Sequence, residues 1–364
     1  MLFSLLRSGL WGRPDASLPA ARPLSGKAWE EVLALAERQT VTGVAYLGLH
    51  HLPEPMEPPV GILVRWAAKA DAIERRNARM GEALGELCLL FRQNGISPVL
   101  QKGHDVAAMY AHPMLRECGD IDFYFTSEEE QAEASAIVSG HGCRVRRAPD
   151  GSDCYSWNGI PVEHHRRLLD IYSPFRKKVA ERLESEYGFE DRQIVAGAAS
   201  GSRVLVRVPS PMLKLLMLNL HILKHAVGRG VGLRQVCDMA VACAFLHDEI
   251  DGNEAESLIR RAGIRKWTRV LQSFMVGCLG LDPGLLPYQD FSASPDALLD
   301  LIISGGNFGR FVPEAADGEA SSLRRKINTA ASFLRNSGFS MTVAPEETLS
   351  VFLELLSGQR RSAD

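Results

Sequence analysis

The sequence lacks an apolar run long enough to cross a membrane, and it lacks the paired C-x-x-C spacing of zinc sites. Its seven cysteines form an odd set without metal spacing, which favours buried, reduced thiols over disulfides. The net charge of −3 provides no overall basic field for nucleic acid. The first residues lack the basic start of a signal peptide, and Arg7 interrupts their short apolar stretch, which favours an amphipathic helix. These absences predict a cytoplasmic protein with no membrane partner. Nothing in them specifically indicates DNA binding.

Length and hydrophobic periodicity predict the organisation of the chain. The 364 residues are long for one domain and suggest two or three, with ordinary globular contents of 46% hydrophobic and 23% charged residues. Helical periodicity dominates before 97 and after 209, whereas strand signals are confined to the region between them. We therefore expect an α+β fold with an N-terminal helical region (1–96), an α/β core (97–208) and a C-terminal helical domain (209–364).

Local signals give several of the expected elements within these regions. Ser25 is placed to cap a helix that runs to about Gln39, and the four prolines of Pro53 to Pro59 predict a linker or rigid loop. The remaining expectations are a long helix from Val60 to Asn94, a helix from Gln131 to Val138, strands at Cys143 to Arg146 and Val204 to Val208, a helix starting at Pro211, and a loop from Gly305 to Asp317.

Two carboxylates one residue apart carry the strongest chemical signal. Asp120 and Asp122 lie at the start of a strand in which Ile121 and Phe123 are apolar. Side chains at i and i+2 of a strand point to the same face, so both carboxylates reach one point in space. A hard cation such as Mg²⁺ prefers oxygen ligands in that arrangement, with substrate phosphates completing its shell. Two solvated aspartates at a strand end are the alternative interpretation of this pair alone.

A glycine turn upstream supports the metal interpretation. Lys102 and Gly103 follow an apolar strand and precede a short helix. A glycine at such a junction lets backbone N–H groups approach a phosphate, and the start of a helix favours anions. Lys102 adds a positive charge at the same place.

These residues resemble the uncharacterised nucleotidyltransferase group within the polymerase-beta-like nucleotidyltransferase superfamily. The resemblance covers about residues 97–170, more loosely 209–245. It is carried by Leu100-Gln101-Lys102-Gly103, Tyr110, Pro113, Arg116 and Gly119-Asp120-Ile121-Asp122. It implies a small mixed sheet with helices, a third carboxylate on a later strand, and transfer of a nucleotidyl group from a nucleoside triphosphate such as ATP with two Mg²⁺ or Mn²⁺ ions.

The third carboxylate implied by the resemblance is Glu163, where the group more often has Asp. Asn158-Gly159 predicts the turn of a hairpin that places Glu163 on its second strand, and His165 takes the place of the group's histidine. An exposed strand glutamate is the alternative. We assign metal binding and catalysis to Asp120, Asp122 and Glu163. Three carboxylates held close together repel one another, so we expect a raised pKa on at least one of them.

Nucleotide contacts are assigned to the glycine turn and to two further basic positions. Lys102, Gly103 and His104 form the turn, where the superfamily usually has Gly-Ser or Gly-Gly. Arg116 is placed to clamp a phosphate, or alternatively is a surface cation that balances Glu117 and Asp120.

The helix that starts at Pro211 supplies the last candidate. The resembling group has a similar histidine-bearing helix, which would cover the nucleotide cleft, and His225 is our candidate on it. The alternative is a buried polar network in which His225 bonds Asp238. His221 and His225 have the i, i+4 spacing of a metal pair, but the sequence indicates no third ligand for zinc.

The function predicted from these patterns is metal-dependent transfer of a nucleotidyl group to an unidentified hydroxyl or phosphate. The acceptor is left open among a small molecule, RNA and protein. The alternatives are an inactive nucleotide-binding regulator and a structural scaffold with the same fold. A basic group is consistent with RNA or with a merely solvated face: Arg144, Arg146, Arg147, Arg166, Arg167, Arg176, Lys177 and Lys178.

Overall fold

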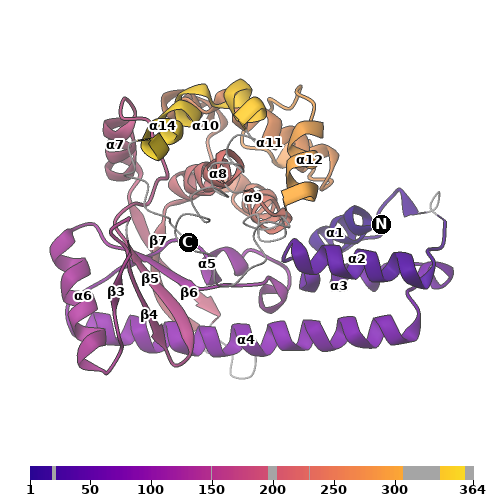
Figure 1. The fold of residues 1–364 in the computed structure, drawn as a ribbon, viewed down its shortest axis with the longest axis horizontal. Coiled ribbons are helices and arrows are strands. Elements are labelled where there is room, and N and C mark those ends of the chain that lie inside the picture. Colours follow the sequence, from indigo (N-terminus) through magenta and orange to yellow (C-terminus); the bar gives the residue numbers. More distant parts are fainter. Residues whose placement is uncertain (19–21, 149, 196–202, 229, 306–336, 357–364) are drawn as a thin grey trace.

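A computed structural model gives the fold of the protein and describes residues 1–18, 22–148, 150–195, 203–228, 230–305 and 337–356. A twisted sheet lies between one long helix and a group of C-terminal helices, and the N-terminal helices pack beside that group (Figure 1). Among the described residues, no helix combines the length and the apolar character that a membrane crossing requires.

In the described residues, four α-helices precede the sheet. They are α1 (Leu2–Trp11), α2 (Gly26–Arg38), α3 (Thr42–Leu49) and α4 (Val60–Gln93), with the 3-10 helix η2 (Glu54–Met56) inside the proline-rich segment. Ser25 caps α2 as predicted, since its side chain accepts a hydrogen bond from the amide of Ala28. The long helix predicted from Val60 is confirmed as α4, whose buried face includes Met80, Leu84 and Phe91.

The sheet has seven strands within the described part of the chain, in the order β3-β4-β5-β2-β1-β7-β6. The strands are β1 (Val99–Leu100), β2 (Ile121–Tyr124), β3 (Arg146–Arg147), β4 (Asp153–Trp157), β5 (Ile160–His165), β6 (Phe189–Val195) and β7 (Arg203–Pro209). Pairing of β2 with β5 and of β1 with β7 is parallel, and the other pairs are antiparallel, so the sheet is mixed as predicted. The elements between the strands are α5 (His104–Ala107), η3 (Pro113–Leu115), α6 (Glu128–Gly140) and α7 (Lys177–Tyr187).

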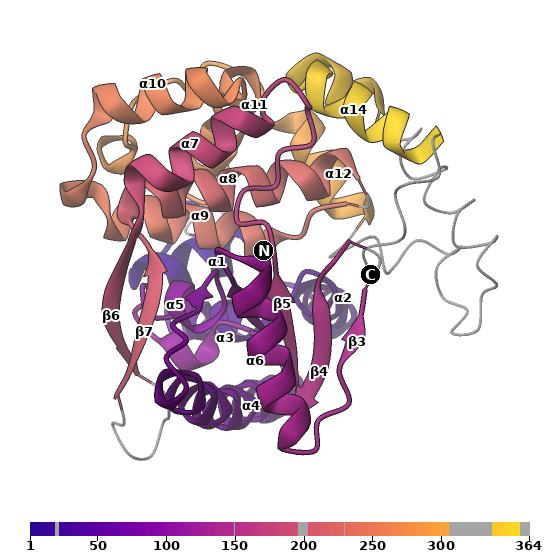
Figure 2. The same cartoon turned by 90° about the vertical axis from the view of Figure 1, so that its left-hand side faces the viewer.

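The two faces of the sheet have different partners. On one face, Phe123, Phe125 and Val162 pack with apolar side chains of α4 and α6 in one hydrophobic cluster. Figure 2 shows α6 in front of the strands and α4 below them. On the other face, Val99 and Tyr124 join a larger cluster formed by the N-terminal and C-terminal helices. Because strand side chains alternate between faces, the central strands β1 and β2 supply residues to both clusters. We call the first face the core face and the second the cleft face.

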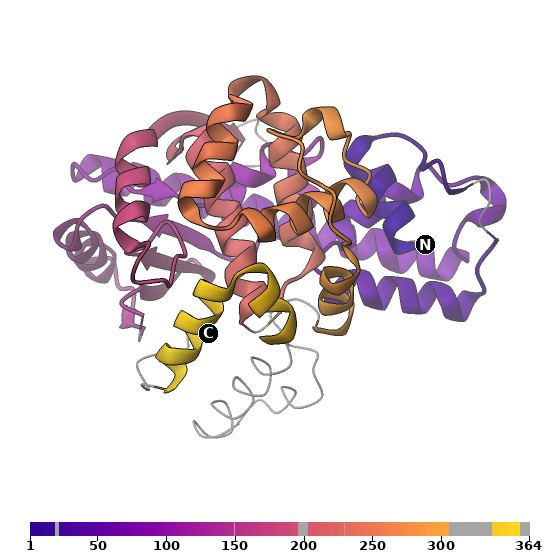
Figure 3. The same ribbon diagram turned by 90° about the horizontal axis from the view of Figure 1, so that it is seen from above.

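Helices follow the sheet, as expected. They are α8 (Pro211–Val227), α9 (Leu233–Phe245), α10 (Gly252–Ala262), α11 (Arg265–Gly277), α12 (Asp296–Gly305) and α14 (Pro345–Leu356), with the 3-10 helices η4 (His247–Glu249) and η5 (Pro283–Leu285). Figure 3 shows the N-terminal helices packed at one end of the molecule beside this group. One hydrophobic cluster contains both Trp29 of the first region and Leu213 of the last. The division into three domains remains a prediction.

The elements expected from local signals are mostly present. The helix predicted at Gln131 is α6, the helix predicted at Pro211 is α8, and the Asn158-Gly159 hairpin joins β4 and β5. The strand expected from Cys143 is limited to Arg146–Arg147, where pairing with β4 occurs. The sequence analysis did not identify β6 or α7. The loop expected from Gly305 to Asp317 lies outside the described residues after its first position.

Candidate active site

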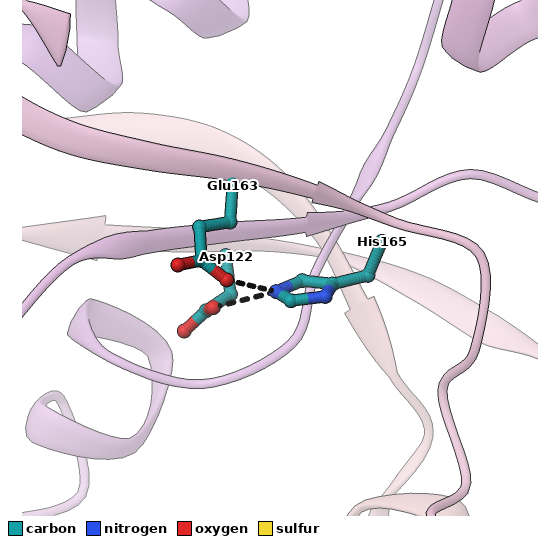
Figure 4. Close-up of side chains that lie close together, drawn as sticks. All are labelled: Asp122, Glu163 and His165. Carbon is teal, nitrogen blue, oxygen red and sulfur yellow. Dashed lines mark hydrogen bonds and ion pairs between the residues drawn. The ribbon is translucent and has the colours of Figure 1, made fainter. Parts of the chain in front are cut away.

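Asp122, Glu163 and His165 meet on the cleft face of the sheet (Figure 4). The parallel register pairs Asp122 on β2 with Glu163 on β5, and His165 lies two residues further along β5 on the same face. One donor atom from each of the three side chains lies within 4.8 Å of the other two. The predicted strand positions therefore bring two carboxylates and one imidazole to a single point.

Asp122 is the buried centre of this group. Its Oδ1 lies 2.8 Å from His165 Nε2, and its Oδ2 lies 3.2 Å from Lys102 Nζ. Burial by itself would raise the pKa of Asp122, but the charges of Lys102 and His165 outweigh that effect and hold the pKa below its usual range. Asp122 is therefore ionised at neutral pH.

The pKa values of the two neighbouring carboxyls, Asp120 and Glu163, are raised instead. The pKa of Asp120 is raised mainly by the charge of Asp122 and then by burial. The pKa of Glu163 is raised mainly by burial and then by Asp122. The expected raised pKa is thus confirmed for two carboxyls. Asp120 lies just before β2 and interacts electrostatically with Asp122, although it is outside the group of donors within 4.8 Å.

Lys102 stands beside the carboxylates at the end of β1. Burial would lower the pKa of its ammonium group. The charges of Asp122 and Asp120 outweigh this effect, so the pKa is raised overall and Lys102 stays protonated. Gly103 adopts φ +70° and ψ −115°, a conformation that favours glycine, and it is the N-cap residue of α5. The backbone conformation explains why this position holds glycine in this chain.

The turn is fixed by two buried contacts. His104 Nε2 lies 3.1 Å from the backbone oxygen of Asn77 on α4, and burial lowers the pKa of His104 to about 4, so its neutral ring donates there. Asp105 pairs with Lys214 of α8 at 2.9 Å, and both side chains are fully buried. The His104 imidazole thus holds the turn against α4, and the structure favours this structural role over a phosphate contact by its side chain.

Arg116 is neither exposed nor balanced by Glu117 and Asp120. It is 4% exposed, and its guanidinium binds Asp238 of α9 through Nε at 2.9 Å and Nη2 at 2.6 Å. Tyr110 donates a hydrogen bond of 2.8 Å to the same carboxylate. This buried pair joins the segment before β2 to α9. It favours a structural role for Arg116 over the predicted phosphate clamp.

A second charged cluster lies on the polar side of α8 and includes a residue that the sequence analysis missed. Asp170 accepts hydrogen bonds from His221 at 3.2 Å and from Lys224 at 2.9 Å. His225 packs edge-to-face on His221, with ring centroids 4.6 Å apart. Burial and then Lys102 lower the pKa of His221 to about 4. No sequence motif marks Asp170, since its partners are more than fifty positions away.

Electrostatic interactions connect this cluster with the glycine turn. The charge of Lys224 lowers the pKa of Lys102, while the carboxylate of Asp170 raises it. Lys102 in turn lowers the pKa of His225, after the larger effects of burial, His221 and Lys224. The polar side chains of α8 therefore lie close enough to Lys102 to shift its pKa. In the described part of the chain, the group Asp122, Glu163 and His165 alone meets the spacing of three metal donors, so zinc on His221 and His225 gains no support.

Comparison with protein families identifies the chain. Residues 25–275, well over half of the sequence, match the family model described as uncharacterised nucleotidyltransferase. The chain belongs to this nucleotidyltransferase family. Comparisons with curated proteins and with solved structures returned no match. The family assignment makes the protein a transferase of nucleotidyl groups with an α+β fold.

Nucleotidyltransferases generally use a divalent metal and a nucleoside triphosphate, and the donor group of this member fits a cation. Asp122 is buried, and its Oδ2 forms an ion pair with Lys102. Glu163 is half-buried, with 30% of its side chain exposed toward solvent. A buried carboxylate beside a second carboxylate and an imidazole is a donor arrangement that a bound cation would stabilise.

Proposed function

We propose that this nucleotidyltransferase moves a nucleotidyl group from a nucleoside triphosphate to an acceptor hydroxyl or phosphate in a metal-dependent reaction. The observation that supports the proposal is the meeting of Asp122, Glu163 and His165 beside Lys102, in a chain of this family. When bound, divalent cations would neutralise the triphosphate and lower the pKa of the attacking hydroxyl.

In this mechanism the carboxylates bind the cations, and one of them accepts the proton of the acceptor hydroxyl. Asp120 and Asp122 precede and occupy β2, and Glu163 faces them from β5. Because the pKa of Glu163 is raised, this carboxylate is the best placed of the three to accept the proton of the acceptor hydroxyl on one of its Oε atoms. Asp122 stays ionised and serves as a ligand.

Lys102 and the Gly103 turn provide the phosphate side of the cleft. The Lys102 side chain is protonated and 25% exposed. Gly103 directly precedes α5 as its N-cap residue. Lys224 adds a second cation from α8, where Asp170 holds its Nζ. Two fixed ammonium groups suit a triphosphate chain that carries several negative charges. His225 lies on the same side and contributes to the wall of the nucleotide cleft.

The test is a screen for turnover and binding with the purified protein. Each of the four nucleoside triphosphates is supplied with Mg²⁺ or Mn²⁺ and with candidate small-molecule, RNA and protein acceptors. Pyrophosphate release and a mass increase of one nucleotidyl group on an acceptor are the expected results. Lys102→Ala should weaken nucleotide binding while it leaves metal binding in place, because it removes a phosphate contact and no ligand.

Two outcomes would replace the proposal. Metal-dependent nucleotide binding without pyrophosphate release, over the whole acceptor panel, would assign the protein to the inactive regulators. No binding of any nucleotide in the presence of either metal would favour a structural scaffold. Exposed Arg65 on α4 provides a matched control for Lys102, since Arg65→Ala removes a cation that pairs with Glu30 outside the cleft.

A further inference from the structure

We propose that His165 Nε2 is a direct ligand of the divalent cation, so that the site has a mixed nitrogen and oxygen donor set and prefers a first-row transition metal such as Mn²⁺ to Mg²⁺. This inference deepens the proposed function, on which it rests for the presence of a cation, by naming the class of metal. It starts from the composition of the donor group, in which one of three members is an imidazole.

The spacing of the donor atoms supports ligation. His165 Nε2 lies 2.8 Å from Asp122 Oδ1 and 3.3 Å from Glu163 Oε2. Ligands about 2.1 Å from one ion stand about 3.0 Å apart in octahedral geometry and about 3.4 Å apart in tetrahedral geometry. The two observed distances therefore match neighbouring positions around one cation. Small side-chain shifts would suffice to place the ion between the three atoms.

The backbone holds the imidazole in this position. The oxygen of His165 accepts a hydrogen bond of 3.0 Å from the amide of Phe125, which extends the pairing of β5 with β2. Glu163 and His165 share one face of the same strand, so their side chains project to the cleft together. His165 is thus presented by the rigid part of the sheet, on which metal ligands are most accurately positioned.

The opposite side of Asp122 is already occupied. Lys102 Nζ lies against Oδ2, whereas His165 Nε2 lies against Oδ1. A cation that binds Oδ1 and Glu163 would repel the Nε2–H group of the imidazole. The ring must then either move away or release its Nε2 proton to solvent and bind the cation through Nε2. Imidazole nitrogen suits transition metals, while Mg²⁺ prefers oxygen donors and water. The donor set consequently favours a first-row transition metal over Mg²⁺, and Mn²⁺ is the transition metal used as the probe below.

The test measures metal binding without turnover. Mn²⁺ is added to the wild-type protein, and electron spin echo modulation reports whether an imidazole ¹⁴N is coordinated. We expect ¹⁴N modulation and a dissociation constant for Mn²⁺ at least tenfold lower than for Mg²⁺. His165→Asn should remove the modulation and weaken Mn²⁺ binding about tenfold, with a smaller change for Mg²⁺. His165→Asp should shift the preference toward Mg²⁺.

A matched control is His141→Asn, since His141 is an exposed histidine at the end of α6. It should behave as the wild type in both measurements. Wild-type Mn²⁺ without ¹⁴N modulation, modulation that survives in His165→Asn, or equal affinities for Mn²⁺ and Mg²⁺ would overturn the inference. If His165→Asn fails to fold, the wild-type spectrum and the two wild-type affinities decide.

The same measurements separate this inference from the proposed function. Imidazole-bound Mn²⁺ in a protein that neither binds nor turns over nucleotide would support the ligand assignment and contradict the transferase mechanism. Nucleotidyl transfer with Mg²⁺, together with a Mn²⁺ spectrum that lacks nitrogen coupling, would support the transferase mechanism and contradict the assignment of His165 as a ligand.

Discussion

His164 and His165 are neighbours on β5, yet they belong to two different environments. His164 is fully buried on the core face, where its ring nitrogens lie 2.9 Å from the Tyr155 hydroxyl and 3.1 Å from the Ser135 hydroxyl. His165 projects from the cleft face to Asp122 and Glu163. Strand alternation alone sends the two rings in opposite directions.

The pKa values express the same difference. Burial and, to a smaller extent, the nearby His165 lower the pKa of His164 to about 3, so the core-face ring is neutral. Burial also acts on His165, but the hydrogen bond to Asp122 and its charge outweigh it and raise the pKa. On the core face, His164 is therefore a neutral hydrogen-bonded partner. The cleft face gathers charges that a ligand would balance, which is typical of a functional site.

Replacing one aspartate on each face gives the largest expected contrast. Asp122→Asn should reduce nucleotidyl transfer on the order of a thousandfold, because it removes a charged ligand and an electrostatic stabiliser of the reaction. Asp153→Asn, on the core face, weakens hydrogen bonds from Gln131, Ser135 and Arg147, and should lower stability by about 2 kcal/mol while transfer by the folded fraction persists. Initial rates and thermal melts distinguish the two. Equal loss of activity in both variants would contradict the assignment of chemistry to the cleft face.

Two lysine–aspartate pairs allow a fully buried ion pair to be compared with a partly exposed one. Lys214→Met leaves the fully buried Asp105 without its partner and should cost about 3–5 kcal/mol of unfolding free energy. Adding Asp105→Asn should recover most of this loss. Lys102→Met should cost less, because Asp122 keeps His165 and Lys102 is partly exposed. Denaturant unfolding measures all four proteins, and a cost for Lys102→Met equal to that for Lys214→Met would reject the distinction.

The two adjacent histidines should differ in their effect on stability. His164→Asn removes a ring that contacts Phe91, Phe123 and Phe125 and bonds two hydroxyls, so we expect a loss of about 2–3 kcal/mol. His165→Asn should change the unfolding free energy by less than about 1 kcal/mol in the absence of metal, because its ring faces the cleft. Equilibrium unfolding in the presence of a chelator tests both. A larger loss for His165→Asn would give it a structural role.

Acid should destabilise the protein through histidines that are buried in neutral form. His104 and His221 each have a pKa lowered to about 4, whereas unfolded histidines titrate near their usual value of 6.5. Between pH 6.5 and 4 the unfolded state binds more protons, so the unfolding free energy falls as pH falls. Each group contributes about 1.4 kcal/mol per pH unit in this window. Unfolding at pH 6.5 and 5 measures the slope, and His104→Gln should make it shallower. An unchanged free energy over this interval would contradict the buried neutral state.

Local sequence patterns determined much of this protein. The i, i+2 spacing of Asp120 and Asp122, the Asn158-Gly159 turn and the apolar stripe of α4 each depend on residues close together in the chain. Short-range sterics and strand or helix periodicity are sufficient to interpret such signals. They predicted the hairpin, the long helix and the face on which Asp122 and Glu163 meet.

Only the tertiary structure decided which partner each charge acquired. Arg116 meets Asp238 from 122 positions away, His165 meets Asp122 from 43, and Lys224 meets Asp170 from 54. The first and third pairs depend on how α9 and α8 pack against the rest of the fold, and the second depends on the pairing of β5 with β2. Periodicity along one element contains no information about the charge on another. The sequence could therefore propose Arg116 as a phosphate ligand, whereas burial against Asp238 favours a structural role. For the same reason it proposed Glu163 as a ligand and left the imidazole beside it without a role.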